Sequence, residues 1–235
     1  MIEFQALSSG SHGNAYIVTD GETPLLLECG ISMSELRKRS GFGLGKIQGC
    51  LLSHEHKDHC KSIKDVMKAG IDLYTSQGTA QALGVDGHRL HTVQAKKQVE
   101  IGSWKVMPFD TIHDCQEPLG FLLTNQVNEK LLFATDTHYI PYKFQGLTHV
   151  CIECNFDTEI LKDNVDNGIV HPQVAKKLWS RHMSLNTLVR FLDAQDLARV
   201  QEIHVLHLSS YNVDEDIVKS TIEKQTGIPV TLEVL

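Results

Sequence analysis

The chain has 235 residues, of which 41% are hydrophobic and 22% are charged, and its formal net charge is −7 at pH 7. That length and composition are ordinary for a folded globular protein and fit one domain over residues 1–235 with a sizeable core. The negative net charge argues against a broad basic surface for binding long nucleic acid. A local basic patch remains open, and its candidate members are Lys57, Lys61, Lys176, Lys177 and Arg181.

The sequence shows no targeting or membrane signal. The segment Met1-Ile2-Glu3-Phe4-Gln5 lacks the basic residues of a signal peptide, and no apolar run approaches the roughly 18 residues of a membrane span. A cytoplasmic protein without a membrane partner is therefore expected. Cys151 and Cys154 match a CxxC pattern. An offset of three along an expected strand would point their sulfurs to opposite faces, which argues against a redox pair.

The first third of the chain reads as short strands, turns and short helices. Asp20-Gly21 is a hairpin signal, and Ser32 with Glu35 forms a capping box that predicts a helix from Met33 to Arg39. Strands are expected at 2–7, 15–20, 23–28, 50–52 and 72–75, helices at 59–70 and 76–83, and loops at 8–14 and 40–49.

In the rest of the chain, most of the expected strands come first and most of the expected helices come later. Strands are expected at 91–94, 98–101, 104–109, 118–124, 130–135, 149–154, 202–208 and 229–234, and helices at 157–165, 171–182, 184–195 and 213–225. This order predicts helix layers packed on sheets.

Four ligand-type side chains crowd into the loop "SHEHKDH" that follows the strand at 50–52. They are His54, His56, Asp58 and His59. Neutral imidazoles and carboxylates bind divalent transition metals. One ion rarely takes four ligands from a single turn, so the spacing favours two adjacent ions. A solvated charged loop is the alternative, and this density of ligand-type residues makes it the weaker interpretation.

Three further ligand-type residues follow downstream, each behind an apolar run. They are His113 in "PFDTIHDC", Asp136 in "LLFATDTHY" and His207 in "IHVLHLSSYN". Together with the His-x-His-x-Asp-His motif, these segments resemble in their order the metallo-β-lactamase superfamily. The resemblance implies an α/β fold of the αββα sandwich type, in which two mixed sheets are flanked by helices.

The same resemblance implies two divalent metal ions per chain, zinc or manganese. His138 and His204 are expected not to be ligands, and His204 would face away from His207 on a strand. The implied ligands are His54, His56 and His113 for one ion, Asp58, His59 and His207 for the other, and Asp136 as the bridge between them.

A narrower resemblance is to the YycJ/WalJ-like branch, whose members are regarded as metal-dependent phosphodiesterases or exonucleases. The chain departs from the family at two points. Glu28-Cys29-Gly30 stands where Asp-Ala-Gly is usual, and Phe156 stands where relatives often have histidine. The segments that carry the resemblance are "SSGSHGNAYIV", "LLLECGIS", "FATDTHY", "IECNFD", "RHMSLN" and "HLSSYN".

His182 in "RHMSLN" bears on the reaction type. It matches a histidine that in related phosphodiesterases contacts the phosphate or serves the leaving group, and Glu153 matches the glutamate that orients it. A helix-end histidine with a structural hydrogen bond is the alternative. The implied catalytic residues are Asp58, Asp136 and His182, and the candidate substrate-binding residues are His182, Ser184, Asn186, Ser209, Asn212 and His12.

These features predict a phosphodiester hydrolase, in the first place a nuclease or exonuclease that acts on DNA or RNA ends through a metal-bridging hydroxide. A phosphodiesterase of cyclic or other small signalling nucleotides is the alternative, and the net charge favours such small substrates. The pair of His182 and Glu153 argues against hydrolysis of a carbon ester, thioester or lactam. The complete ligand set argues against a non-catalytic binding protein. Relatives often dimerise, so the resemblance also implies a homodimer.

Overall fold

A computed structural model describes residues 1–234. Within that range the chain divides into two compact units. The N-terminal unit comprises residues 1–110 and 115–129, and the C-terminal unit comprises residues 111–114 and 130–234. The single domain predicted from the sequence stays a prediction. No helix of the described residues combines the length and the apolar character needed to cross a membrane.

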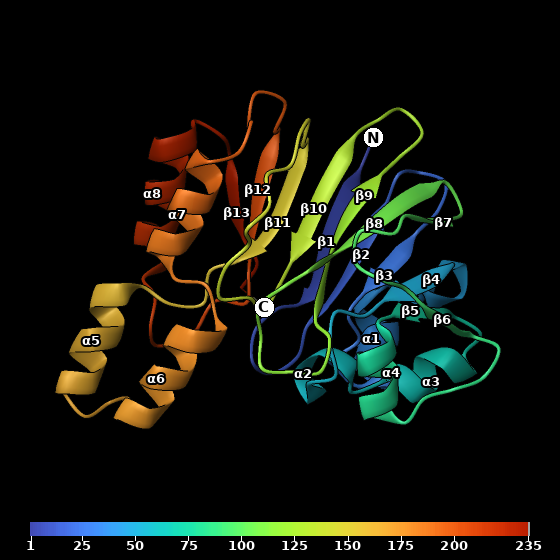
Figure 1. Ribbon diagram of the computed structural model, residues 1–235, viewed down its shortest axis with the longest axis horizontal. Coiled ribbons are helices and arrows are strands. Elements are labelled where there is room, and N and C mark those ends of the chain that lie inside the picture. The colour runs from blue at the N-terminus through green and yellow to red at the C-terminus, as the bar shows by residue number, and fades with distance from the viewer. Residues whose placement is uncertain (235) are drawn as a thin grey trace. The chain divides into compact units, whose positions relative to one another are not determined.

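A mixed sheet forms the centre of the N-terminal unit (Figure 1). Its first three strands pair antiparallel, because short loops join neighbouring strands directly: residues 9–14 join the first to the second, and the Asp20-Gly21 turn, with Gly21 at φ 93°, joins the second to the third. The later strands pair parallel and are joined through helical segments. In order across the sheet, the strands are β1 (Glu3–Ser8), β2 (Ala15–Thr19), β3 (Leu25–Leu27), β4 (Gly49–Leu51), β5 (Asp72–Thr75) and β6 (Leu90–Thr92).

Short helices and an antiparallel meander complete this unit. The connecting helices are α1 (Met33–Arg39), the 3-10 turn η1 (Gly43–Lys46), α2 (Lys57–Cys60), α3 (Ile63–Lys68) and α4 (Gln77–Leu83). The meander consists of β7 (Val99–Ile101), β8 (Trp104–Asp110) and β9 (Leu119–Thr124).

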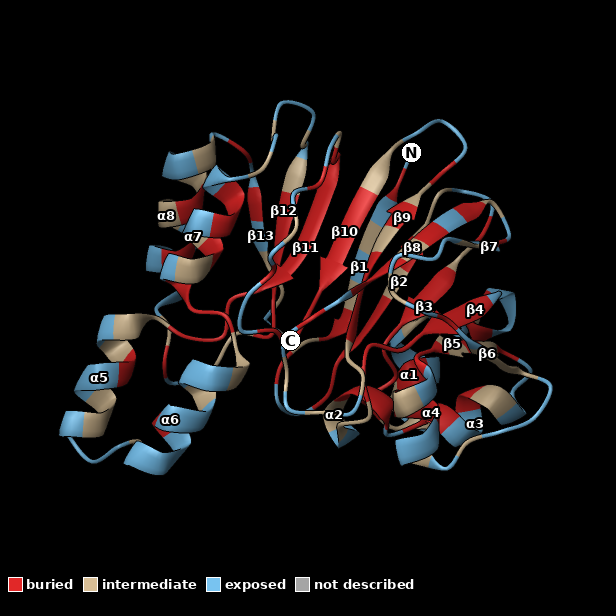
Figure 2. Cartoon of the chain, viewed as in Figure 1, coloured by how far each residue is buried: buried red, intermediate tan, exposed pale blue. Residues whose placement is uncertain are grey.

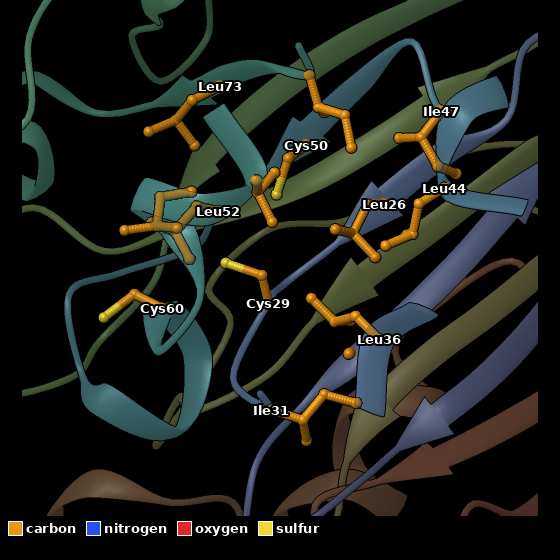
Figure 3. Packing of buried hydrophobic residues seen from close by; sticks show 14 of the residues in the cluster. Leu26, Cys29, Ile31, Leu36, Leu44, Ile47, Cys50, Leu52, Cys60 and Leu73 are labelled. Atoms are coloured by element: carbon orange, nitrogen blue, oxygen red, sulfur yellow. The ribbon is translucent and has the colours of Figure 1, made fainter. Parts of the chain in front are cut away.

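The core of the N-terminal unit lies between its sheet and α1 to α3. Leu26, Leu36, Cys50 and Leu52 are fully buried there, as Figure 3 shows. The middle strands β3 and β4 are buried along their whole length, which explains why they read as continuous apolar runs. This core fixes the end of β4, and the loop that carries His54, His56, Asp58 and His59 begins just beyond that strand.

Two local expectations for this unit need correction. The helix expected over 59–70 is interrupted at Ser62, whose N–H donates to the Cys29 carbonyl at 3.0 Å and whose hydroxyl donates to the Ile31 carbonyl. These long-range hydrogen bonds hold Ser62 at φ −104° and ψ 13°, outside the helical region. The loop expected over 40–49 contains η1, a single tight turn.

The C-terminal unit is built on a parallel sheet with helices in its connections. The central strand β11 is buried at every position, and Figure 2 shows the same burial along most of β10 and β12. The strands run in the order β10 (Lys130–Ala134), β11 (His149–Glu153), β12 (Glu202–Leu206) and β13 (Val230–Leu232). The helices are α5 (Thr158–Asp166), α6 (Pro172–Arg181), α7 (Leu185–Asp193) and α8 (Glu215–Thr226).

His204, on β12, is held between two carboxylates and is not near the ligand-type residues. Its Nδ1 lies 2.7 Å from Glu233 Oε1, and its Nε2 lies 3.1 Å from Glu202 Oε1. Burial lowers the pKa of His204, but the hydrogen bonds with Glu233 and Glu202 outweigh burial, so the pKa is raised above 6.5. When it is protonated, the ring therefore ties the end of the chain after β13 to β12.

The contacts of His204 with Glu202 and Glu233, which we call the Glu202–Glu233 clamp, predict that the free energy of unfolding depends on pH. Because the folded-state pKa is raised, the contribution of His204 is complete below pH 6.5 and is lost as the pH rises through the folded value. We expect the wild type to lose about 1.5 kcal/mol relative to His204→Gln between about pH 6 and about pH 9. Urea unfolding of both proteins at the two pH values measures this difference. An equal pH dependence in the two proteins would contradict the charged clamp.

Candidate metal centre

The loop from β4 into α2 carries His54, His56, Asp58 and His59, which we call the N-terminal half-site. Its ligand atoms fall into two neighbouring pairs. His54 Nε2 lies 3.1 Å from His56 Nδ1, and Asp58 Oδ2 lies 3.4 Å from His59 Nε2. His54 and His59 are buried in the unit. Two pairs from one loop fit the sequence expectation that this motif serves two ions.

Groups behind the N-terminal half-site fix its rings. Glu28 Oε2 lies 3.4 Å from His59 Nδ1, and Ser53 Oγ lies 2.8 Å from His54 Nδ1. The Ser53 contact on Nδ1 leaves Nε2 of the His54 ring as the atom beside His56, and the Glu28 carboxylate lies next to Nδ1 of His59. Burial raises the pKa of Glu28, although its contacts with His59 and Ser53 lower it. Glu28, the glutamate in place of the usual aspartate, therefore lies beside His59 of the half-site.

Asn14 is a residue of this half-site that the sequence interpretation missed. Its backbone N–H donates to the Asp58 carbonyl at 2.7 Å, and its Nδ2 lies 3.2 Å from His59 Nε2. Gly30 sits directly against the same carbonyl, since a Cβ at Gly30 would lie 1.6 Å from Asp58 O. The only signal in the sequence was the turn-rich segment that contains Asn14, which does not reveal its partner.

In the C-terminal unit, His113, Asp136 and His207 form what we call the C-terminal half-site. His113 Nε2 lies 3.6 Å from Asp136 Oδ2, and His207 Nε2 lies 3.6 Å from Asp136 Oδ1. These separations are too long for good hydrogen bonds. They suit two ligands of one ion, because ligand atoms about 2.1 Å from a metal lie roughly 3.4 Å apart in tetrahedral geometry. Each oxygen of Asp136 thus faces one imidazole.

The backbone of this half-site is held in an uncommon conformation. Asp136 has φ 45° and His207 has φ 55°, in the left-handed region that side chains with a Cβ rarely adopt. The Asn155 amide donates to the His207 carbonyl at 3.0 Å, and a Glu153 carboxylate oxygen accepts from the Asp136 N–H at 3.1 Å. Such strain, of order 1–3 kcal/mol per residue, is typical of functional sites.

The surroundings of His113 favour its neutral imidazole. Its Nδ1 donates to the Arg181 carbonyl at 3.0 Å, because a carbonyl can only accept, and this leaves the Nε2 lone pair facing Asp136. Burial lowers the pKa of His113, although Asp136 raises it. The neutral imidazole is the form that binds a metal ion. The Arg181 guanidinium lies 2.5 Å from Asp114, which anchors this contact.

His182 and Glu153 lie beside the C-terminal half-site. His182 Nδ1 is 3.2 Å from Glu153 Oε2 and 4.0 Å from Asp136 Oδ2. The fully buried Glu153 also accepts the N–H groups of Asp136, Thr137 and Met183. Both of its oxygens therefore already accept backbone N–H groups, whereas each oxygen of Asp136 faces an imidazole.

The other residues named from the sequence are placed as follows. His138 is exposed, and His204 belongs to the Glu202–Glu233 clamp. Phe156 is buried against Trp179, with ring centroids 5.1 Å apart. The proposed substrate contacts have local roles: Ser184 caps α7, Asn212 donates to Ser209 Oγ, Asn186 is exposed beside Thr158, and His12 is exposed in the N-terminal unit. Their contact with a substrate stays a prediction.

Comparison with known proteins places this geometry in a family. Residues 23–205 match the family model described as the beta-lactamase superfamily domain. The chain is 28% identical over 253 residues to exodeoxyribonuclease YycJ of Bacillus anthracis, covering 91% of this chain and 92% of that protein. It is 24% identical over 244 residues to exodeoxyribonuclease WalJ of Streptococcus pneumoniae, covering 95% and 87%.

The fold agrees with a solved structure as well. The metallo-β-lactamase fold protein YhfI from Bacillus subtilis superposes with a TM-score of 0.73 at 16% identity, covering 99% of this chain and 96% of that one. The predicted α/β fold, with mixed sheets flanked by helices, is therefore confirmed. The chain belongs to the beta-lactamase superfamily domain family and has the metallo-β-lactamase fold of a metal-dependent hydrolase.

Proposed function

We propose that this metal-dependent hydrolase cleaves phosphodiester bonds at the ends of nucleic acid, with two divalent ions held jointly by the two half-sites. The observation that carries the proposal is the pairing at Asp136, where each carboxylate oxygen faces one imidazole at 3.6 Å. Two relatives of near-equal length are named exodeoxyribonucleases, which supports this substrate class.

The donor set fits the proposed ions. Each half-site offers two pairs of donor atoms, all of them imidazole nitrogens or carboxylate oxygens and none a cysteine sulfur, which suits zinc and manganese alike. We assign His54, His56 and His113 to one ion, and Asp58, His59 and His207 to the other, with Asp136 shared. Two such ions supply an activated water and neutralise charge on a phosphodiester.

The protein's own residues would then orient the substrate and move a proton. Glu153 accepts the His182 Nδ1 proton, so His182 Nε2 is the atom left to face a substrate. From Nε2 a protonated His182 would donate to the leaving oxygen or stabilise the charge on the phosphate. Its side chain is 14% exposed. Asp58 and Asp136 would orient the attacking water as well as hold the ions.

A product assay tests the substrate class. Protein loaded with Mn²⁺ or Zn²⁺ is incubated with 5′- and 3′-labelled single-stranded DNA and RNA, and in parallel with 3′,5′-cyclic nucleotides. We expect stepwise shortening of the oligonucleotides, with the label giving the polarity. Ring opening of the cyclic nucleotides with intact oligonucleotides would instead establish the small-nucleotide alternative, which the net charge of −7 favours.

The variant His182→Ala separates a substrate-directed histidine from a metal ligand. We expect turnover to fall by about 10²- to 10⁴-fold, because the proton donor is lost, while the metal content stays at the wild-type value. Metal analysis by mass spectrometry beside the kinetic assay provides both readings. Loss of an ion from this variant would make His182 a ligand and contradict its assignment as the proton donor.

A further inference from the structure

A basic pocket lies next to Asp58, within the N-terminal unit. It has a volume of about 250 Å³. None of the metal ligands other than Asp58 lines it, so it is distinct from the half-site while sharing one wall with it. Its lining residues are Ser11, His12, Gly30, Lys57, Asp58 and Lys61.

The walls of this pocket are fixed by backbone hydrogen bonds. The N–H of Asn14 donates to the Asp58 carbonyl at 2.7 Å, and the N–H of Gly13 donates to the Gly10 carbonyl at 3.0 Å. These bonds hold the loop that carries Ser11 and His12 against the start of α2. Gly30 forms a floor that no larger residue could form, because its Cβ position meets the Asp58 carbonyl.

Two ammonium groups reach this pocket from one side of α2. Lys57 and Lys61 are four residues apart, which places their side chains on the same face of the helical turn. Both are exposed. Within residues 1–234 neither has an ion-pair partner, whereas Lys68 on α3 pairs with Asp65. His12 adds hydrogen-bond capacity, and Ser11 adds a hydroxyl.

Asp58 is the only acidic group in the lining, and its carboxylate is directed elsewhere. Its Oδ2 lies 3.4 Å from His59 Nε2, its neighbour in the N-terminal half-site. When Asp58 serves as a metal ligand, its negative charge is balanced by the ion. The remaining charge of the pocket is then positive, which suits an anion with several oxygen acceptors.

We propose that this pocket binds a second phosphate group of the substrate, next to the phosphodiester that is cleaved. The inference rests on the proposed function, because Asp58 places the pocket beside the scissile group only if Asp58 holds an ion. It narrows the substrate class to nucleic-acid ends or short oligonucleotides with at least two phosphates. A cyclic mononucleotide has a single phosphate and would leave the pocket unused.

Three dinucleotides test the proposal: thymidylyl-thymidine without a terminal phosphate, with a 5′-phosphate and with a 3′-phosphate. Each is given to the metal-loaded wild type, to the Lys57→Gln/Lys61→Gln variant and to Lys64→Gln. Lys64 is an exposed lysine of α3 outside the pocket, so Lys64→Gln is a matched control. The readout is the ratio of kcat/KM for the phosphorylated and unphosphorylated substrates within each protein, which cancels any general loss of activity.

We expect a terminal phosphate at one of the two ends to raise kcat/KM about tenfold in the wild type and in Lys64→Gln. The gain should shrink to less than about twofold in the Lys57→Gln/Lys61→Gln variant. A gain of equal size in the double variant would overturn the pocket assignment. So would the absence of a gain from either terminal phosphate in the wild type.

A binding measurement keeps this inference separate from the proposed function. Thymidine 3′,5′-bisphosphate is titrated into each metal-loaded protein by calorimetry, without any need for cleavage. We expect about tenfold weaker binding in the double variant than in Lys64→Gln. Equal affinities of the double variant and Lys64→Gln would contradict the proposed phosphate site, whatever the cleavage assay shows. A tenfold difference without cleavage of any dinucleotide would support the pocket and count against the phosphodiesterase function alone.

Discussion

Replacement of Asp136 by asparagine is expected to reduce turnover by about 10³-fold or more while the protein stays folded. Asparagine keeps the size of the side chain and tolerates the left-handed backbone of this position, where φ is 45°. It removes the charge and one of the two ligand oxygens that face His113 and His207. The shared ligand would be lost, so metal content per chain should fall in parallel.

Kinetics, metal analysis and circular dichroism on the same preparation measure this result. Asp163→Asn, an exposed aspartate of α5, is the matched control and should retain both activity and metal. Alanine at position 136 is a poorer test, because it would add backbone strain to the loss of the carboxylate. Full activity of Asp136→Asn with a wild-type metal content would exclude a bridging role for this residue.

Replacement of Glu153 by glutamine is expected to destabilise the fold by about 3 kcal/mol and to impair catalysis. The buried carboxylate accepts hydrogen bonds from the Asp136, Thr137 and Met183 N–H groups. An amide offers one oxygen in place of two, so at least one N–H would face an NH₂ group. Each buried donor left unsatisfied costs about 1–3 kcal/mol.

Urea unfolding monitored with the activity assay separates the two effects. Glu100→Gln changes an exposed glutamate of β7 and should shift the unfolding free energy by less than about 0.5 kcal/mol. The loss of turnover in Glu153→Gln should resemble that of His182→Ala, since Glu153 holds His182 at 3.2 Å. A Glu153→Gln protein as stable and active as the wild type would show that this network neither supports the backbone nor positions His182.

The identity of the half-site residues was accessible from the sequence. His54, His56, Asp58 and His59 are close in the chain, and local spacing alone places them on one turn. His113, Asp136 and His207 each follow an apolar strand, so their place at a strand end could be inferred from pattern. Local sequence patterns also predicted most strands and helices. Buried parallel strands appear in the sequence as apolar runs, and the first residues of helices include capping residues.

What the sequence could not supply were partners brought together over long separations. The interruption at Ser62 depends on carbonyl groups of Cys29 and Ile31, and no helix propensity contains that information. Asn14 and Asp58 are also far apart in the chain, as are His113 and the Arg181 carbonyl that accepts its proton. Backbone groups carry no sequence signal, since every residue has the same carbonyl and almost every residue has the same N–H.

The imidazoles and carboxylates of this protein, and the strand ends and loops that carry them, follow from the sequence alone. How these groups are used depends on segments that meet only in the folded chain. Folding sets each oxygen of Asp136 toward one histidine, engages Glu153 with backbone donors and brings the loop of Ser11 and His12 beside Lys57 and Lys61. The physical reason is that side-chain type and local spacing are properties of a short segment. Distances of 3–4 Å between remote segments are fixed by packing of the core and by hydrogen bonds between them.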